Sequence, residues 1–143
     1  MSAGTGIWHS EFNNSETEPC SLYQIWIFPK ERDIKPRYDQ KLFDVSNRKN
    51  NFQLLVSPEK NNEMLWINQD AFISLGEFDD KSEIIYNIKN DKNGIFIMLT
   101  KGKIEIAEEI LEKRDSISIH DIKEIKINVI EKSELLIIEV PMN

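Results

Sequence analysis

The sequence contains few residues of the kinds that cross-link a small protein or coordinate a metal. Its 143 residues include one cysteine, Cys20, and two histidines, His9 and His120. A single thiol cannot form a disulfide within the chain, so nothing indicates an oxidising compartment. Cys20 has no histidine at a telling spacing, and we expect a free cysteine rather than a nucleophile. Two histidines also exclude a three-histidine metal site built by this chain alone.

Long apolar runs and an excess of positive charge are missing too. No run approaches the roughly 18 apolar residues that a helix needs to cross a bilayer. The first residues lack the basic and apolar regions of a signal peptide. We therefore expect a cytoplasmic protein that does not bind membranes. The formal net charge of −7 disfavours direct binding to nucleic acid, because phosphates repel an acidic surface.

Short runs with apolar residues at every second position are abundant, and they are typical of strands that are half-buried in a sheet. Isoleucine, whose branched Cβ suits a pleated surface, dominates the later runs. Many short strands spaced by roughly ten residues predict an all-β sandwich or barrel. The runs cover residues 23–28, 52–56, 63–68, 71–78, 83–88, 95–99, 103–106, 116–120, 124–129 and 133–140.

Turn residues between these runs predict how they connect. Asn93-Gly94 and the Lys-Gly-Lys sequence at 101–103 are typical of hairpin turns. Residues 104–113 have fair helix propensity. The alternation that begins at Ile104 favours a strand there instead.

Residues 29–51 contain two prolines and many charges without a clear period, which is typical of a connector. The sequence is therefore divided into a front part, residues 1–40, and a C-terminal domain, residues 41–143. The second part has a common size for a domain.

His9 and Glu11 form the most informative chemical pattern. In an extended segment, side chains two residues apart share one face. An imidazole and a carboxylate side by side can hold a divalent transition metal. By itself an H-x-E sequence is far more often a solvated strand face, and two ligands are fewer than a stable protein metal site uses.

The sequence around this pair makes it more specific. It reads MSAGTGIWHSEFNNS, then Glu-Pro, then QIWIFP, then P-x-Y-D-Q. This series resembles the family of pirins and bacterial pirin-like quercetin dioxygenases, and the resemblance extends to about residue 140. The matching positions are residues 1–11, Asn13, Glu18, Pro19, residues 24–27, Pro29, Pro36, Tyr38 and Gln40, followed more loosely by Ser57, residues 69–71, Tyr86, Gly102 and Asp115.

The resemblance implies a bicupin, in which two β-barrel-like domains pack together and the front one holds a metal, usually iron. In that family three histidines and one glutamate are the ligands. The last histidine and the glutamate correspond to His9 and Glu11, and Glu11 is also the candidate catalytic base. The first two histidines form an H-x-H upstream of the MSAGTG segment and have no counterpart here. We therefore expect an incomplete site for iron or another divalent transition metal. The alternative that this chain binds no metal also stays open.

By the same resemblance, residues 41–143 should form a complete, cupin-like rear domain without a metal. Residues 1–40 should form the tail strands of an incomplete front cupin and the connector. Because an incomplete barrel exposes sheet edges and apolar faces, we expect the front part to pair with another copy or with a separate N-terminal cupin half, or to pack back on the rear cupin.

Other residues have simpler structural explanations. Trp8, Trp26 and Trp66 could line a pocket, but core packing is preferred because tryptophan buries a large area. His120 is expected at the surface or in a turn. Arg114 stands where the family usually has the glycine of a Gly-Asp turn, which predicts strain or a different turn.

Two classes of function follow, and both stay open. The first is a metal-dependent dioxygenase that opens flavonols such as quercetin, with the other ligands coming from a second polypeptide or an N-terminal segment. The second is a non-catalytic binding or regulatory module, since pirins are also known as metal-dependent transcriptional cofactors.

Overall fold

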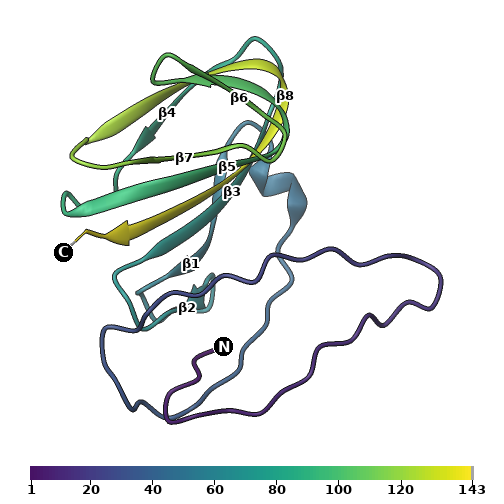
Figure 1. Ribbon diagram of the computed structural model, residues 1–143, viewed down its shortest axis with the longest axis vertical. Helices are drawn as coiled ribbons and strands as arrows, with labels where there is room; N and C mark the ends of the chain where they lie inside the picture. The colour runs from purple at the N-terminus through teal and green to yellow at the C-terminus, as the bar shows by residue number, and fades with distance from the viewer. Residues whose placement is uncertain (143) are drawn as a thin grey trace.

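The structure is a computed structural model that describes residues 1–142, so residue 143, the last of the predicted rear domain, lies outside it (Figure 1). Strands make up almost all of its regular structure, which confirms the all-β prediction. Among the described residues, no helix has the length and apolar character that crossing a bilayer requires. The elements are η1 (Val45–Arg48), β1 (Phe52–Ser57), β2 (Leu65–Trp66), β3 (Phe72–Phe78), β4 (Glu83–Asn87), β5 (Asn93–Ile106), β6 (Glu109–Glu112), β7 (Ser116–Ile119) and β8 (Glu124–Pro141).

All eight strands belong to one sheet, with the order β2-β1-β3-β8-β5-β6 and with β4 on β8 and β7 on β5. The long strands β5 and β8 pair along almost their whole length. The first half of β5 also pairs with β7, and its second half with β6. The first half of β8 pairs with β4, and its second half with β3. The sheet therefore has two sections that share β5 and β8.

The hairpin turn predicted at residues 101–103 is wrong because β5 is continuous there. Residues 101–103 lie inside the strand, where the register with β8 shifts at Lys101 and Lys103. Gly102 has φ of +87°, and a Cβ on it would come within 2.3 Å of the Lys132 carbonyl oxygen. The Lys-Gly-Lys sequence is thus a bulge, where the local twist increases, rather than a reversal of the chain.

Asn93 and Gly94 are the first residues of β5, and the Asn93 N–H donates to the Asn90 carbonyl oxygen at 2.8 Å. The turn therefore spans residues 90–93, and it does not join a hairpin, because β4 and β5 each pair with β8. Similarly, the runs predicted at residues 124–129 and 133–140 are parts of the single strand β8.

Strand rather than helix is confirmed for residues 104–113, but as two strands, since the end of β5 and β6 form a hairpin there. Its turn residues Ala107 and Glu108 have φ of 50° and 66°. The strain predicted at Arg114 is also found, because this residue has φ of 79°, a conformation that favours glycine.

The apolar core lies between the two sections of the sheet. Its buried side chains come from β3 to β6 and β8, and Phe52 of β1 packs against it. The Phe52 ring lies 4.8 Å from that of Phe78 and 5.2 Å from that of Tyr86, both edge to face, a favourable aromatic arrangement. The fully buried core members are Ile97, Leu99, Ile104, Ile106, Ile127, Leu135 and Ile137.

One fully buried group is a carboxylate, that of Glu139 in β8. It accepts hydrogen bonds from the Tyr86 hydroxyl (3.0 Å), from the backbone N–H groups of Lys89 (2.9 Å) and Asn90 (3.0 Å), and from Asn93 Nδ2 (2.9 Å). Burial and the neighbouring Glu139 carboxylate raise the pKa of Tyr86. The hydroxyl therefore stays protonated and donates. Glu139 joins β4, β5 and β8 at the turn before β5.

Residues 1–44 contain no strand among the elements of the described chain, apart from an isolated bridge between Ser2 and Arg37. The strand predicted at residues 23–28 is therefore wrong. Alternating apolar residues favour an extended chain, but a strand exists only where a neighbouring strand accepts and donates its backbone hydrogen bonds. We call residues 1–40 the front segment.

Candidate metal centre

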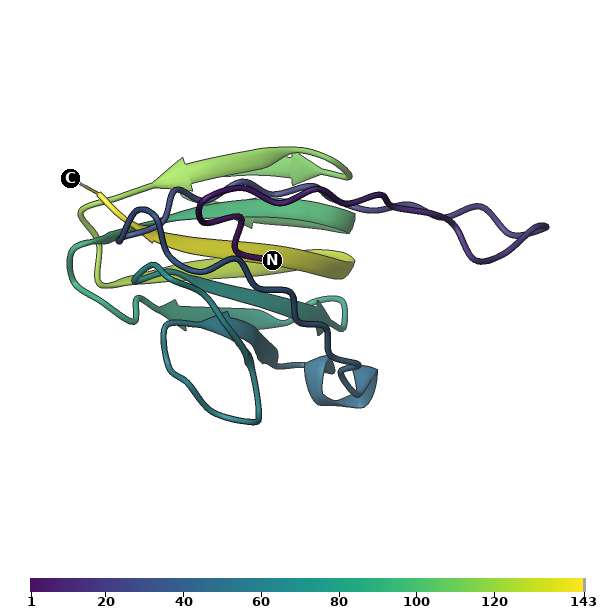
Figure 2. The same ribbon diagram turned by 90° about the horizontal axis from the view of Figure 1, so that it is seen from below.

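The front segment leaves the sheet and returns to it as a long loop, residues 3–27, which we call the front loop. In Figure 1 it runs across the lower part of the molecule, and in Figure 2 its tip extends well beyond the ends of the strands. Both ends of this loop lie near β2 and the residues that follow it. The loop thus has a fixed base and a tip that projects into solvent.

Hydrogen bonds fix the base. Ser2 and Arg37 exchange backbone hydrogen bonds of 2.9 and 3.0 Å. The Arg37 guanidinium donates to the Trp66 carbonyl oxygen at 2.9 Å and lies over the Trp66 ring, 4.8 Å from its centroid. On the returning side, the Lys30 N–H donates to the Asn68 carbonyl oxygen at 2.7 Å. The front segment is therefore packed back on the rear part of the chain at these points.

His9 and Glu11 are brought together as the sequence predicts. His9 Nδ1 lies 4.0 Å from Glu11 Oε1, and the two side chains are 39% and 56% exposed. Both line a cavity of about 660 Å³ between the front segment and β1 to β3. Trp26, Trp66 and Ile67 line the same cavity, which therefore has apolar walls beside a polar pair.

The pair fits a divalent transition metal in donor type. Imidazole nitrogen and carboxylate oxygen are donors that such ions accept. With metal–ligand bonds of about 2.0–2.2 Å, two ligands at tetrahedral or adjacent octahedral positions lie roughly 3.0–3.4 Å apart, so His9 Nδ1 and Glu11 Oε1, now 4.0 Å apart, would move slightly closer to share one ion. Among residues 1–142, no three His, Cys, Asp or Glu side chains lie close enough together to hold a metal. Within the described chain, the pair stands by itself.

The structure corrects one interpretation and bears out two others. Core packing is wrong for Trp8 and Trp26, which are exposed on the front loop, while Trp66 is half-buried. Trp26 and Trp66 instead line the cavity. His120 is exposed as predicted, with Nδ1 2.7 Å from Asp121 Oδ2. Cys20 is free and exposed.

Sequence reasoning missed Arg37 and Glu139. A basic residue between Pro36 and Tyr38, both matching positions, was the available signal for Arg37. For Glu139 the signal was a single carboxylate inside the apolar run LLIIEV, residues 135–140.

The comparisons with known proteins first define the class, a cupin-like β fold. The crystal structure of YhhW from Escherichia coli superimposes with a TM-score of 0.75 at 27% identity, over 82% of this chain and 49% of that one. A second structure of the same protein, described as a bacterial pirin in complex with nickel(II), gives a TM-score of 0.73 over the same shares of both chains.

The family follows from sequence. Residues 54–140 match the quercetinase C-terminal cupin domain, and residues 1–27 match the pirin model. The chain belongs to the pirin family. It is 36% identical to quercetin 2,3-dioxygenase of Escherichia coli K12 over 99% of its length, and 31% identical to a pirin-like protein of Caulobacter vibrioides over 97%. It spans 59% and 60% of the lengths of these two relatives.

Proposed function

We propose that His9 and Glu11 are two of the ligands of a divalent metal in a quercetin 2,3-dioxygenase-type protein. The observation that carries this proposal is their 4.0 Å approach on the wall of an apolar cavity. The names of the E. coli relative and of the nickel complex support a metal-dependent dioxygenase. Since a stable site needs more than two protein ligands, further ligands come from polypeptide outside the described residues.

A metal held by His9 and Glu11 would supply Lewis acidity toward an oxygen atom of the substrate. His9 supplies a neutral nitrogen donor. Glu11 supplies a negative oxygen donor and, being 56% exposed, can also accept a proton from a flavonol hydroxyl. The Trp26 and Trp66 side chains that line the cavity provide flat apolar surfaces for an aromatic ligand and reduce its contact with water.

The proposed partner is a separate cupin half rather than a second copy of this chain. The front segment exposes the aromatic side chains of Trp8, Phe12, Trp26 and Phe28, which an interface with a partner would cover. No lysine or arginine occurs among residues 1–29, whereas Glu11, Glu16 and Glu18 do. Two front loops would therefore repel each other, and a partner with basic residues around an apolar groove fits better.

The same exposed aromatic side chains favour a second candidate, a non-catalytic binding module. Such a module would dock a partner through the front loop without turnover.

The location of the protein in the cytoplasm also stays a prediction.

The test uses the protein purified from its source as a native complex, so that any polypeptide bound to it is retained. We expect bound metal and dioxygen uptake when quercetin is added. His9→Ala should lower the metal affinity by more than about 100-fold. Mutating a residue that only hydrogen-bonds to a metal ligand already lowers the affinity by about 10–100-fold. Glu11→Gln should lower uptake as well.

His120→Ala is the matched control, because this exposed histidine contacts Asp121 and not the cavity. It should retain full uptake and metal. Metal-free protein that binds its partner would favour the binding module. Dioxygen uptake that survives His9→Ala would contradict the proposal.

A further inference from the structure

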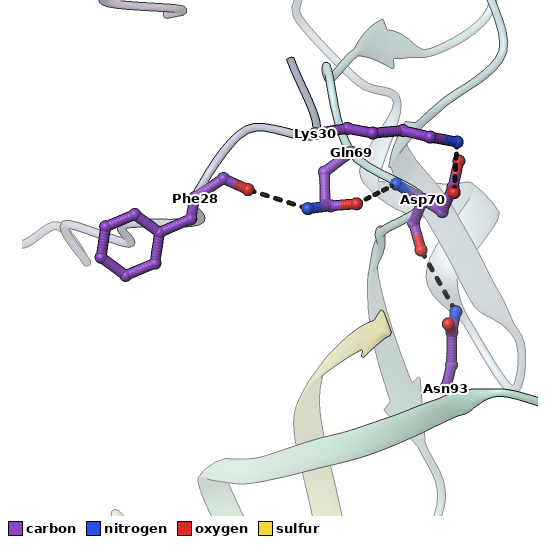
Figure 3. A network of polar contacts seen from close by, with 5 residues as sticks. All are labelled: Phe28, Lys30, Gln69, Asp70 and Asn93. Atoms are coloured by element: carbon purple, nitrogen blue, oxygen red, sulfur yellow. Dashed lines mark hydrogen bonds and ion pairs between the residues drawn. The ribbon is translucent and has the colours of Figure 1, made fainter. Parts of the chain in front are cut away.

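The short connection between β2 and β3, residues 67–71, contacts both the front segment and the buried interior (Figure 3). Gln69 Nε2 donates to the Phe28 carbonyl oxygen at 3.0 Å, and Gln69 Oε1 accepts from the Asp70 N–H at 2.8 Å. The Asp70 carboxylate lies 2.6 Å from Lys30 Nζ. One side of this connection therefore faces residues 28–30 of the front segment.

The other side leads into the core. The Asp70 carbonyl oxygen accepts from Asn93 Nδ2 at 3.2 Å, as drawn in Figure 3. Asn93 is only 2% exposed, and its Nδ2 also donates to Glu139. A continuous series of hydrogen bonds thus runs from the front segment through Gln69, Asp70 and Asn93 to the buried Glu139 carboxylate.

The members of this series differ in strength. Lys30 and Asp70 side chains are 58% and 42% exposed, and exposed ion pairs of this kind contribute little. The Gln69 amide makes two hydrogen bonds in fixed directions, one to each side. Its Oε1 atom accepts a hydrogen bond within the connection between β2 and β3, whereas its Nε2 atom donates one to the front segment. The donor is therefore the part of Gln69 that couples the two parts, beside the Lys30 N–H bond to the Asn68 carbonyl oxygen and the bond of 3.1 Å from Asn68 Nδ2 to the Glu31 carbonyl oxygen.

We propose that Gln69 is a positioning residue that holds the base of the front loop on the rear domain, with Asn93 and Glu139 anchoring it to the core. Phe28 and Ile67 both line the cavity beside His9 and Glu11. A shift of residues 28–30 against residues 67–69 would therefore change its shape. That consequence for the metal pair rests on the proposed function, whereas the positioning role does not.

The test is amide hydrogen exchange of the metal-free chain, followed at the Lys30 amide, which is bonded to the Asn68 carbonyl oxygen. In Gln69→Glu a carboxylate oxygen still accepts from the Asp70 N–H, but the donor to Phe28 is lost. We expect the Lys30 amide to exchange roughly tenfold faster, as for loss of one hydrogen bond of typical strength. Gln69→Leu, which loses both bonds, should do the same.

The amide of Leu99 in β5, bonded to the Asp115 carbonyl oxygen, should keep its exchange rate in both variants. Glu83→Gln is the control, because this residue pairs with Lys126 on β4 and β8, away from the front segment. It should leave the Lys30 amide unchanged.

Wild-type exchange of the Lys30 amide in Gln69→Glu would overturn the proposal, since Gln69 would then serve only its own connection. An equal acceleration at Leu99 would overturn it too, because the change would be global. No metal is present in this experiment, so its outcome is separate from that of the proposed function.

Discussion

Glu139→Ala should lower the free energy of unfolding by about 2–5 kcal/mol, because it leaves several buried hydrogen-bond donors without an acceptor. The carboxylate accepts from the Tyr86 hydroxyl, two backbone N–H groups at residues 89 and 90, and Asn93 Nδ2. Alanine would leave these donors without an acceptor in a region that water does not reach. Each unsatisfied buried donor costs about 1–3 kcal/mol.

Urea unfolding followed by tryptophan fluorescence measures this loss as a lower midpoint at unchanged slope. Glu124→Ala is the control, because Glu124 lies on the same strand and is exposed. It should stay within about 0.5 kcal/mol of wild type, as exposed substitutions usually do. A loss below about 1 kcal/mol in Glu139→Ala would show that the buried carboxylate does not hold the turn before β5.

Gly102→Ala should lower the free energy of unfolding by about 2–4 kcal/mol, for two reasons that add. The φ of +87° is strained for any residue with a Cβ, which costs about 1–3 kcal/mol. The new methyl would also lie 2.3 Å from the Lys132 carbonyl oxygen and 2.3 Å from Ser133 Oγ. Relieving that overlap requires β5 and β8 to separate, at a further cost of roughly 1–3 kcal/mol.

Gly94→Ala is the matched control in the same strand. A Cβ there would meet the Met142 side chain at 2.9 Å, which is flexible and near the end of the chain. Its loss should stay below about 1 kcal/mol in the same unfolding measurement. Equal losses in the two variants would contradict the bulge as the reason for glycine at position 102.

Gly102 also shows how far the fold could be predicted from the sequence. Alternation predicted strands at nearly every place where β1 to β8 occur, because the buried face of a sheet requires it. It could not distinguish a bulge at Gly102 from a hairpin, because both place glycine at positive φ. The distinction depends on β8, whose partner residues are about thirty positions away, such as Glu131 opposite Lys103.

The candidate site was predictable only where its residues are close together in the sequence. His9 and Glu11 are close in sequence, so an extended chain was enough to bring them together. The contacts that hold the front segment join distant residues, such as Gln69 to Phe28 and Arg37 to Trp66. No period or short motif encodes such pairs. The exposure of Trp8 and Trp26 likewise follows from the path of the front loop and not from residue type.

The central claim is that His9 and Glu11 bind one metal ion together with ligands that the described residues do not supply. Mass spectrometry of the metal content of the purified, monomeric chain tests it most directly, after loading with iron(II) or nickel(II) and removal of free metal. We predict far less than one ion per chain, with the residual binding reduced by His9→Ala and unchanged by His120→Ala. One tightly held ion per monomeric chain that persists in His9→Ala would contradict the claim.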